Sequence, residues 1–181
     1  MTRRHVALIR GINVGKAKRV AMADLRALVE GLGYRDVRTL LNSGNVVFTA
    51  SASDRRDPAA RIEGAMTKAL GVSARVTGVT EEELAALVAE NPLGKIATDP
   101  TRLLVTVLMD PADRKRLLPL ARQDWAPEAF GVGKRAAYVW CPKSMLESPL
   151  FTAVTRLLGD GATTRNWATI TKLHALLGGR P

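Results

Sequence analysis

Short β-type runs and amphipathic helical segments alternate along this chain, and the order of strands and helices in the first half is largely repeated in the second half. The strand-like runs are rich in Val, Leu and Ile, whereas apolar residues in the helical segments recur every three or four positions. In the first half the predicted order is strand 6–9, helix 22–32, strand 37–41, strand 46–49, helix 58–70 and strand 74–79. This βαββαβ order is the ferredoxin-like one.

The second half repeats most of that order. After a helix that opens at a capping box, Thr80–Glu83, and ends at Asn91-Pro92, the predicted elements are strand 103–109, a helix from Pro111, strands 128–132 and 135–141, and a helix from Pro149 to Leu158. Where a fourth strand is due, the sequence instead predicts a glycine-rich turn and a final helix from Asn166.

We therefore predict an α+β protein with two related ferredoxin-like (βαββαβ-type) subdomains packed into one compact unit. Residues 1–181 would form a single domain, with a first lobe at 1–79 and a second lobe, including the C-terminal helix, at 80–181. Hydrophobic residues make up 46% of the chain, enough for a core, and aliphatic side chains must fill it because aromatic residues make up only 4%.

The expected location is the cytoplasm. The chain starts directly with a strand-like run, without the apolar stretch of a secretory signal, and no later run is long enough to span a membrane. Its single cysteine, Cys141, excludes an internal disulfide and fits a reducing compartment.

Positive charge is concentrated in two parts of the chain. The net charge is +10, with nine Lys and Arg against three Asp and Glu in residues 1–50, six against eight in 51–100, and twelve against six in the remainder. Such a distribution attracts phosphates, in nucleic acid or in a small ligand. It is equally consistent with basic residues that only solvate the surface of an Arg-rich protein.

The strongest candidate for a ligand site is the loop Arg10–Arg19, between the first strand and the first helix. Lys16, Lys18 and Arg19 precede a helix start that is itself electropositive, which costs about 0.3–1 kcal/mol for each cation. A bound anion would remove this repulsion and satisfy unpaired backbone N–H groups. The alternative is a solvated turn without a specific ligand.

This loop matches neither of the common nucleotide motifs. Three residues separate Gly11 from Gly15 and Ala17 follows Lys16, whereas a P-loop needs four residues and a hydroxyl at those places. Asn13, two positions after Gly11, excludes the G-x-G-x-x-G pattern. No site for Mg²⁺ and a nucleoside triphosphate is predicted.

Two further segments have a structural explanation beside a functional one. In the segment 163–167, Asn166 fits a helix cap, and Arg165 again places a cation at a helix start. The segment 42–45, Asn-Ser-Gly-Asn, could present two amides and a hydroxyl, but a tight hairpin turn explains all of its residues.

Familiar catalytic sets are missing from the sequence. The two histidines, His5 and His174, fall in regular elements, no metal-ligand spacing occurs, and Cys141 fits a buried thiol better than a nucleophile. We expect no metal and no cofactor. An RNA-recognition sheet is disfavoured because its stacking aromatics would be at best half present.

Several motifs together resemble a known family. They are residues 8–15, Met22 with Leu25, residues 41–48, Asn91-Pro92 and residues 164–169. This set, which covers nearly the whole chain, is similar to the uncharacterised bacterial family called domain of unknown function 1697. The resemblance implies an α+β fold with two intertwined ferredoxin-like subdomains. It implies no activity.

The polar and glycine residues of these motifs form the predicted ligand-binding set, on the expectation that distant motifs converge into one pocket. The set comprises Arg10, Gly11, Asn13, Gly15, Lys16, Asn42, Ser43, Asn45, Arg165 and Asn166. No catalytic residue is assigned.

The leading hypothesis is a protein that binds a phosphorylated or other anionic small ligand. The sequence leaves open a metal-independent enzyme acting on a nucleotide-like or carboxylate substrate, and a nucleic-acid-associated or homo-oligomeric interaction module. Nucleic acid would be bound through its phosphates, and no membrane partner is expected. The oligomeric state does not follow from the sequence.

Overall fold

The computed structural model describes residues 1–179, which divide into two compact units. The first comprises Met1–Glu82 and the described residues from Ala175 onward, and the second comprises Glu83–His174. Each unit contains one four-stranded antiparallel sheet. None of the helices in residues 1–179 combines the length and apolar character that crossing a membrane would require.

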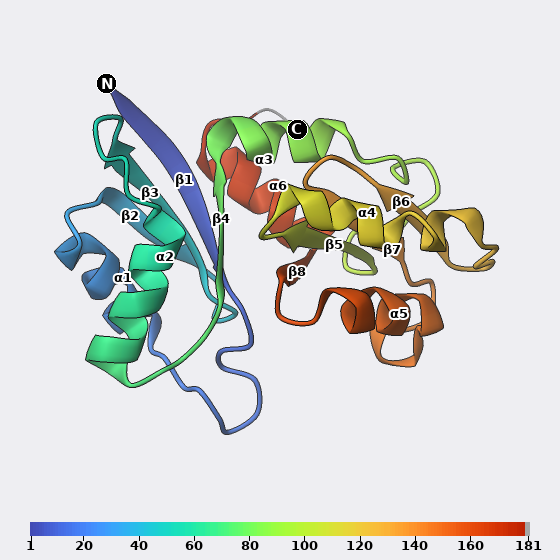
Figure 1. The fold of residues 1–181 in the computed structure, drawn as a ribbon, viewed down its shortest axis with the longest axis horizontal. Helices are drawn as coiled ribbons and strands as arrows, with labels where there is room; N and C mark the ends of the chain where they lie inside the picture. The colour runs from blue at the N-terminus through green and yellow to red at the C-terminus, as the bar shows by residue number, and fades with distance from the viewer. Residues whose placement is uncertain (180–181) are drawn as a thin grey trace. The chain divides into compact units, whose positions relative to one another are not determined.

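The first unit has the predicted βαββαβ order (Figure 1). Its elements are β1 (Thr2–Ile9), α1 (Met22–Gly31), β2 (Arg35–Leu40), β3 (Asn45–Ser51), α2 (Pro58–Ala65) with a π-helical turn η1 (Met66–Leu70), and β4 (Val76–Thr80). The strand order in the sheet, β2-β3-β1-β4, is the ferredoxin-like arrangement. Helix α3 (Glu81–Ala89) follows β4 directly.

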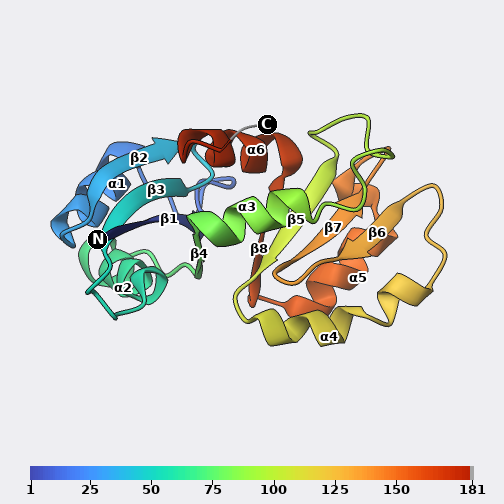
Figure 2. The ribbon, with the colours of Figure 1, turned by 90° about the horizontal axis from the view of Figure 1, so that it is seen from above.

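One face of this first sheet carries the core beneath α1 and α2 (Figure 2). Residues at alternate positions of β1, β3 and β4 point to this face, as the period of a strand requires. The core contains Ala7, Ile9, Val46, Phe48 and Val76 from the strands, and Leu25, Val29, Ile62 and Met66 from the helical segments. Strand β1 is four residues longer at its start than predicted because its polar residues 2–5 continue the pairing with β3.

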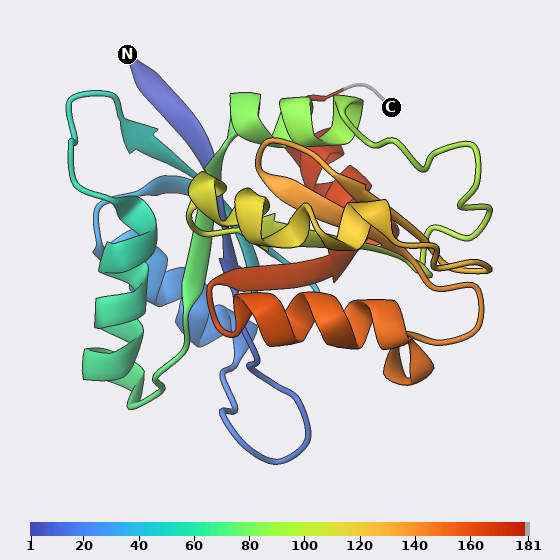
Figure 3. The same cartoon turned by 45° about the vertical axis from the view of Figure 1, so that its right-hand side comes forward.

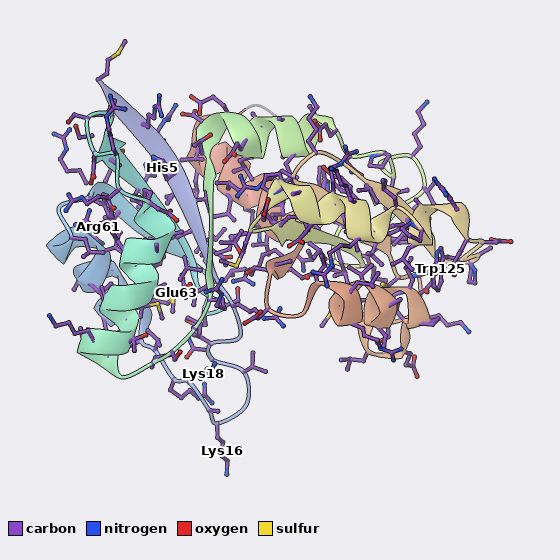
Figure 4. The ribbon with its side chains drawn as sticks, in the orientation of Figure 1. His5, Lys16, Lys18, Arg61, Glu63 and Trp125 are labelled. Atoms are coloured by element: carbon purple, nitrogen blue, oxygen red, sulfur yellow. The ribbon has the colours of Figure 1, made fainter. Side chains whose placement is uncertain are left out.

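A half-buried arginine fastens α2 to the segment after α1 (Figure 4). Arg61 donates hydrogen bonds to the Tyr34 hydroxyl (2.9 Å) and to the Leu32 carbonyl (2.9 Å), and pairs with Asp54 at 3.2 Å. Its guanidinium also lies 5.0 Å from the centre of the Tyr34 ring. Since its hydrogen bonds go to neighbouring elements, Arg61 serves the fold.

The second unit repeats the order of the first. It contains β5 (Leu103–Leu108), η2 (Pro111–Asp113), α4 (Arg114–Leu117), η3 (Leu120–Arg122), β6 (Ala129–Val132), β7 (Ala136–Trp140), η4 (Met145–Glu147), α5 (Pro149–Leu158), β8 (Ala162–Asn166) and α6 (Trp167–Leu176). Its sheet has the order β6-β7-β5-β8, again ferredoxin-like. The predicted helix from Pro111 is broken into the short segments η2, α4 and η3.

The prediction that the second half lacks a fourth strand is wrong. Residues 162–166 form β8, which pairs antiparallel with β5 from Leu108↔Ala162 to Leu104↔Asn166 (Figure 3). The two strands also share a side-chain contact, since the Thr106 and Thr164 hydroxyls lie 2.9 Å apart. The last helix consequently starts at Trp167 instead of Asn166.

Candidate anion-binding site

An open pocket of about 360 Å³ lies at the start of α1. Its lining comes from the β1–α1 loop and from the turn between β2 and β3: Asn13, Arg19, Val20, Ala21, Met22 and Asn42. The pocket therefore brings together two of the sequence motifs singled out for ligand binding. Of the predicted set, Asn13 and Asn42 line it.

Asn13 holds the loop and the turn together. Its side-chain N–H groups donate to the carbonyls of Val20 and Asn42, both at 2.8 Å, and its side-chain oxygen accepts from the Val20 N–H at 2.8 Å. Its φ of 56° lies in the left-handed region, which asparagine tolerates better than most residues. Because both of its donors are used within the protein, Asn13 shapes the pocket and has no spare N–H for a ligand.

The turn at residues 41–44 is fixed by a buried asparagine and a glycine. Asn45 is fully buried and donates to the Leu40 carbonyl (2.7 Å) and to the Ser43 hydroxyl (3.0 Å). Gly44 has a φ of +86°, and a Cβ there would lie 2.8 Å from the Ile12 side chain. These contacts confirm the tight turn predicted from the sequence and leave Asn42 exposed at its edge.

The start of α1 lacks a side-chain cap. The first N–H groups of a helix have no partner within it, and Ala21 at the N-cap supplies no side-chain acceptor. Arg19, on the pocket wall, is exposed and has no ion-pair partner among residues 1–179. Asp24 in the first turn is the one acidic residue of α1 placed to offset this positive region.

Other residues predicted from the same loop lie outside the pocket lining. Lys16 is at the outer tip of the loop and points away from the body of its unit (Figure 4). Gly11 and Gly15 have φ of +67° and +62° and make the turns of the loop. A Cβ at either position would have no neighbouring heavy atom within 4 Å. Arg10 continues β1, and its N–H donates to the Arg75 carbonyl at 2.9 Å.

The remaining two predicted residues belong to the second unit. Asn166 caps α6, because its side-chain oxygen accepts from the Thr169 N–H at 2.9 Å. Arg165 on β8 donates to the Thr164 carbonyl at 2.9 Å, and burial lowers the pKa of its guanidinium to about 10. The expected convergence of this motif with the β1–α1 loop stays a prediction.

Arg19 is the charged pocket residue that the predicted set omitted. The sequence had already marked Arg19 as a cation before the first helix, and it precedes the first residue of α1 by three positions. Val20, Ala21 and Met22 also line the pocket and were outside the predicted set.

Groups able to support catalysis are sparse in the described residues. Within residues 1–179, no three His, Cys, Asp or Glu side chains gather in a way that could hold a metal ion. Cys141 is buried, and this burial raises the pKa of its thiol, although a hydrogen bond with Ser148 opposes the shift. Burial also raises the pKa of Tyr138, whose hydroxyl donates to the Leu87 carbonyl.

Comparisons with known proteins address the fold and the family. A solved structure, that of the conserved bacterial protein SP0830 from Streptococcus pneumoniae, matches with a TM-score of 0.79 and 22% identity over 98% of this chain and 99% of that chain. At that identity the likeness shows the fold alone. No curated protein matched the chain significantly. The family model described as "Protein of unknown function (DUF1697)" matches residues 1–138, and the chain therefore belongs to the DUF1697 family.

Proposed function

We propose that the pocket at the start of α1 binds the anionic group of a small ligand, a phosphate ester or a carboxylate. The observation that supports this most is the combination of an uncapped helix start with the exposed Arg19 on the wall of the same pocket. A helix start stabilises negative charge through its N–H groups and its dipole, and a guanidinium adds a charge-assisted donor.

The pocket's dimensions suit a small molecule. Its volume of about 360 Å³ falls at the lower end of small-molecule pockets. The Asn42 side chain, exposed at the rim, would orient the ligand, while Asn13 keeps the loop in place through its three hydrogen bonds. The proposal includes a cytoplasmic location, which the scarcity of cysteine, with Cys141 as the single one, supports.

Calorimetric titration with inorganic phosphate and with adenosine monophosphate tests the proposal. We expect saturable binding to the unmodified protein, and Arg19→Ala should weaken it about three- to tenfold, the range for loss of one charge-assisted hydrogen bond on an open surface. Lys68→Ala removes the same charge from the π-helical turn η1, outside the pocket, and should leave binding unchanged.

Two results would contradict the proposal. One is the absence of any heat of binding with either anion. The other is an equal loss of affinity in Arg19→Ala and Lys68→Ala, which would indicate a general effect of net charge. A single-stranded oligonucleotide that binds much more tightly than adenosine monophosphate, with a steep salt dependence, would favour nucleic acid as the anionic partner.

A further inference from the structure

A second pocket, in the second unit, is walled by aromatic and proline side chains. It has a volume of about 220 Å³ and lies among the segments before β6, after β7 and at the start of α5. Trp125 lines it together with Pro127, Pro142 and Pro149. These four residues are spread over 25 positions of the sequence and form no local pattern. None of them belongs to the motifs discussed above.

Three N–H groups of the pocket lining are already used within the protein. The Trp125 indole N–H donates to the Leu120 carbonyl at 2.8 Å, so the tryptophan offers the pocket only ring surface. The backbone N–H of Ala126 donates to the Asp124 carboxylate at 3.0 Å, and that of Glu128 donates to the Trp125 carbonyl at 2.8 Å. The prolines have no N–H at all. The side-chain donors that remain in the lining are the Lys143 ammonium and the Ser144 hydroxyl.

Carboxylates outnumber basic groups in the lining of the pocket. Glu128 and Glu147 both line it, and neither takes part in an ion pair among residues 1–179. One oxygen of Glu128 accepts from the Leu150 N–H at 3.2 Å, which leaves its other oxygen available to a ligand. With Lys143 as the one basic lining residue, the lining carries a net negative charge in a chain whose net charge is +10.

We propose that this pocket binds a small organic cation, an alkylammonium or guanidinium head group. The Trp125 ring would provide a cation–π contact, and Glu128 and Glu147 would provide the counter-charge. The volume of about 220 Å³ is below the range for drug-sized ligands, so the pocket accommodates a head group with a short alkyl chain. This proposal is independent of the anion pocket at α1.

Binding of butylammonium to protein labelled with 5-fluorotryptophan tests the proposal by ¹⁹F NMR. The chain has three tryptophans, and Trp125→Phe identifies the Trp125 resonance as the one that disappears. We expect the Trp125 resonance alone to shift saturably with butylammonium, and neither butyrate nor butanol to shift it comparably. Comparable shifts with butyrate or butanol, or no shift with butylammonium, would overturn the proposal.

Charge variants separate a specific site from general electrostatics. Glu147→Gln should weaken butylammonium binding about threefold, because an exposed carboxylate contributes modestly, and Lys143→Met should strengthen it by a similar factor. Asp160→Asn removes one exposed negative charge from the same unit outside the pocket and should have no effect. An effect of Asp160→Asn equal to that of Glu147→Gln, or an unchanged affinity in Lys143→Met, would refute the site.

The same ammonium group could come from a free amine or from a lysine side chain of a peptide. Nα-acetyl-lysine amide, which carries this group on a peptide backbone, distinguishes the two sources. Tighter binding than that of butylammonium would identify a peptide, and weaker binding would identify a free amine.

Discussion

The hydrogen bonds of Asn13 provide a direct test of how the pocket at the start of α1 is held open. Replacing Asn13 with alanine removes three side-chain hydrogen bonds, all of 2.8 Å, that join residue 13 to Val20 and Asn42. The backbone at residue 13 must also keep its left-handed φ of 56°, which asparagine adopts at a lower cost than alanine. Both effects destabilise the loop in the folded protein.

The expected cost follows from these two contributions. Each hydrogen bond contributes about 0.5–1.5 kcal/mol, and the bond to Asn42 belongs to the lower end because it is exposed. The left-handed conformation costs alanine about 1 kcal/mol. The free energy of unfolding should therefore fall by about 3 kcal/mol in Asn13→Ala. Asn13→Gly loses the same hydrogen bonds without the conformational strain, so it should be less destabilised by about 1 kcal/mol.

Urea denaturation followed by circular dichroism measures the overall cost, and amide hydrogen exchange locates it. In the unmodified protein the Val20 N–H is bonded to the Asn13 side chain and should exchange slowly. It should become the amide with the largest increase in exchange rate in both variants. If Val20 keeps its protection and the unfolding free energy changes by less than about 0.5 kcal/mol, Asn13 does not hold the loop as described.

Three further predictions concern stability and reactivity. Gly44→Ala should lower the free energy of unfolding by about 2–4 kcal/mol, because residue 44 has a φ of +86° and its Cβ would lie 2.8 Å from the side chain of a core isoleucine. Gly15→Ala, which has open space around it, should lower this free energy by only about 1 kcal/mol. Equal losses in the two variants would refute the packing argument. Because burial raises the pKa of Tyr138 above its usual 10.0, folding stability should decrease as the pH rises above 10, and Tyr138→Phe should flatten this decrease. Cys141 should react with a thiol reagent at pH 8 only as fast as the protein opens, and a rapid stoichiometric reaction would contradict its burial.

The first half of the fold was accessible from the sequence because its local signals agree with its tertiary contacts. The aliphatic run Val6–Ile9 is a buried strand, and the turn after β2 has a glycine, Gly44, at a position with a φ of 86°. The boundaries were less accessible. Residues 2–5 extend β1 although they are polar, since backbone pairing with β3 decides their conformation.

At the candidate site, the sequence identified residues but not the direction of their side chains. The sequence identified Asn13 and Asn42 as residues of interest, and both line the pocket. It could not show that the Asn13 donors are directed to backbone carbonyls, because Asn42 is 29 positions away along the chain. Lys16 and Arg19 are both basic residues of the same loop, yet only Arg19 reaches the pocket, because Lys16 occupies the tip. Composition gives the charge of a loop but not the direction of its side chains.

Strand β8 shows how a repeated order can outweigh local composition. The segment Ala162–Asn166 has no apolar run, and judged by itself it favours a turn followed by a helix cap. As an edge strand it needs hydrogen bonds on one side only, and these are supplied by β5, whose six residues are all buried. Threonine suits such a position because it is β-branched and its hydroxyl can pair across strands, as Thr164 does with Thr106. The strands β5, β6 and β7 already follow the order of the first unit. Because β5 is buried, its backbone N–H and C=O groups on the side away from β7 need a partner strand. The symmetry of the two units therefore predicts β8 even where its residues do not.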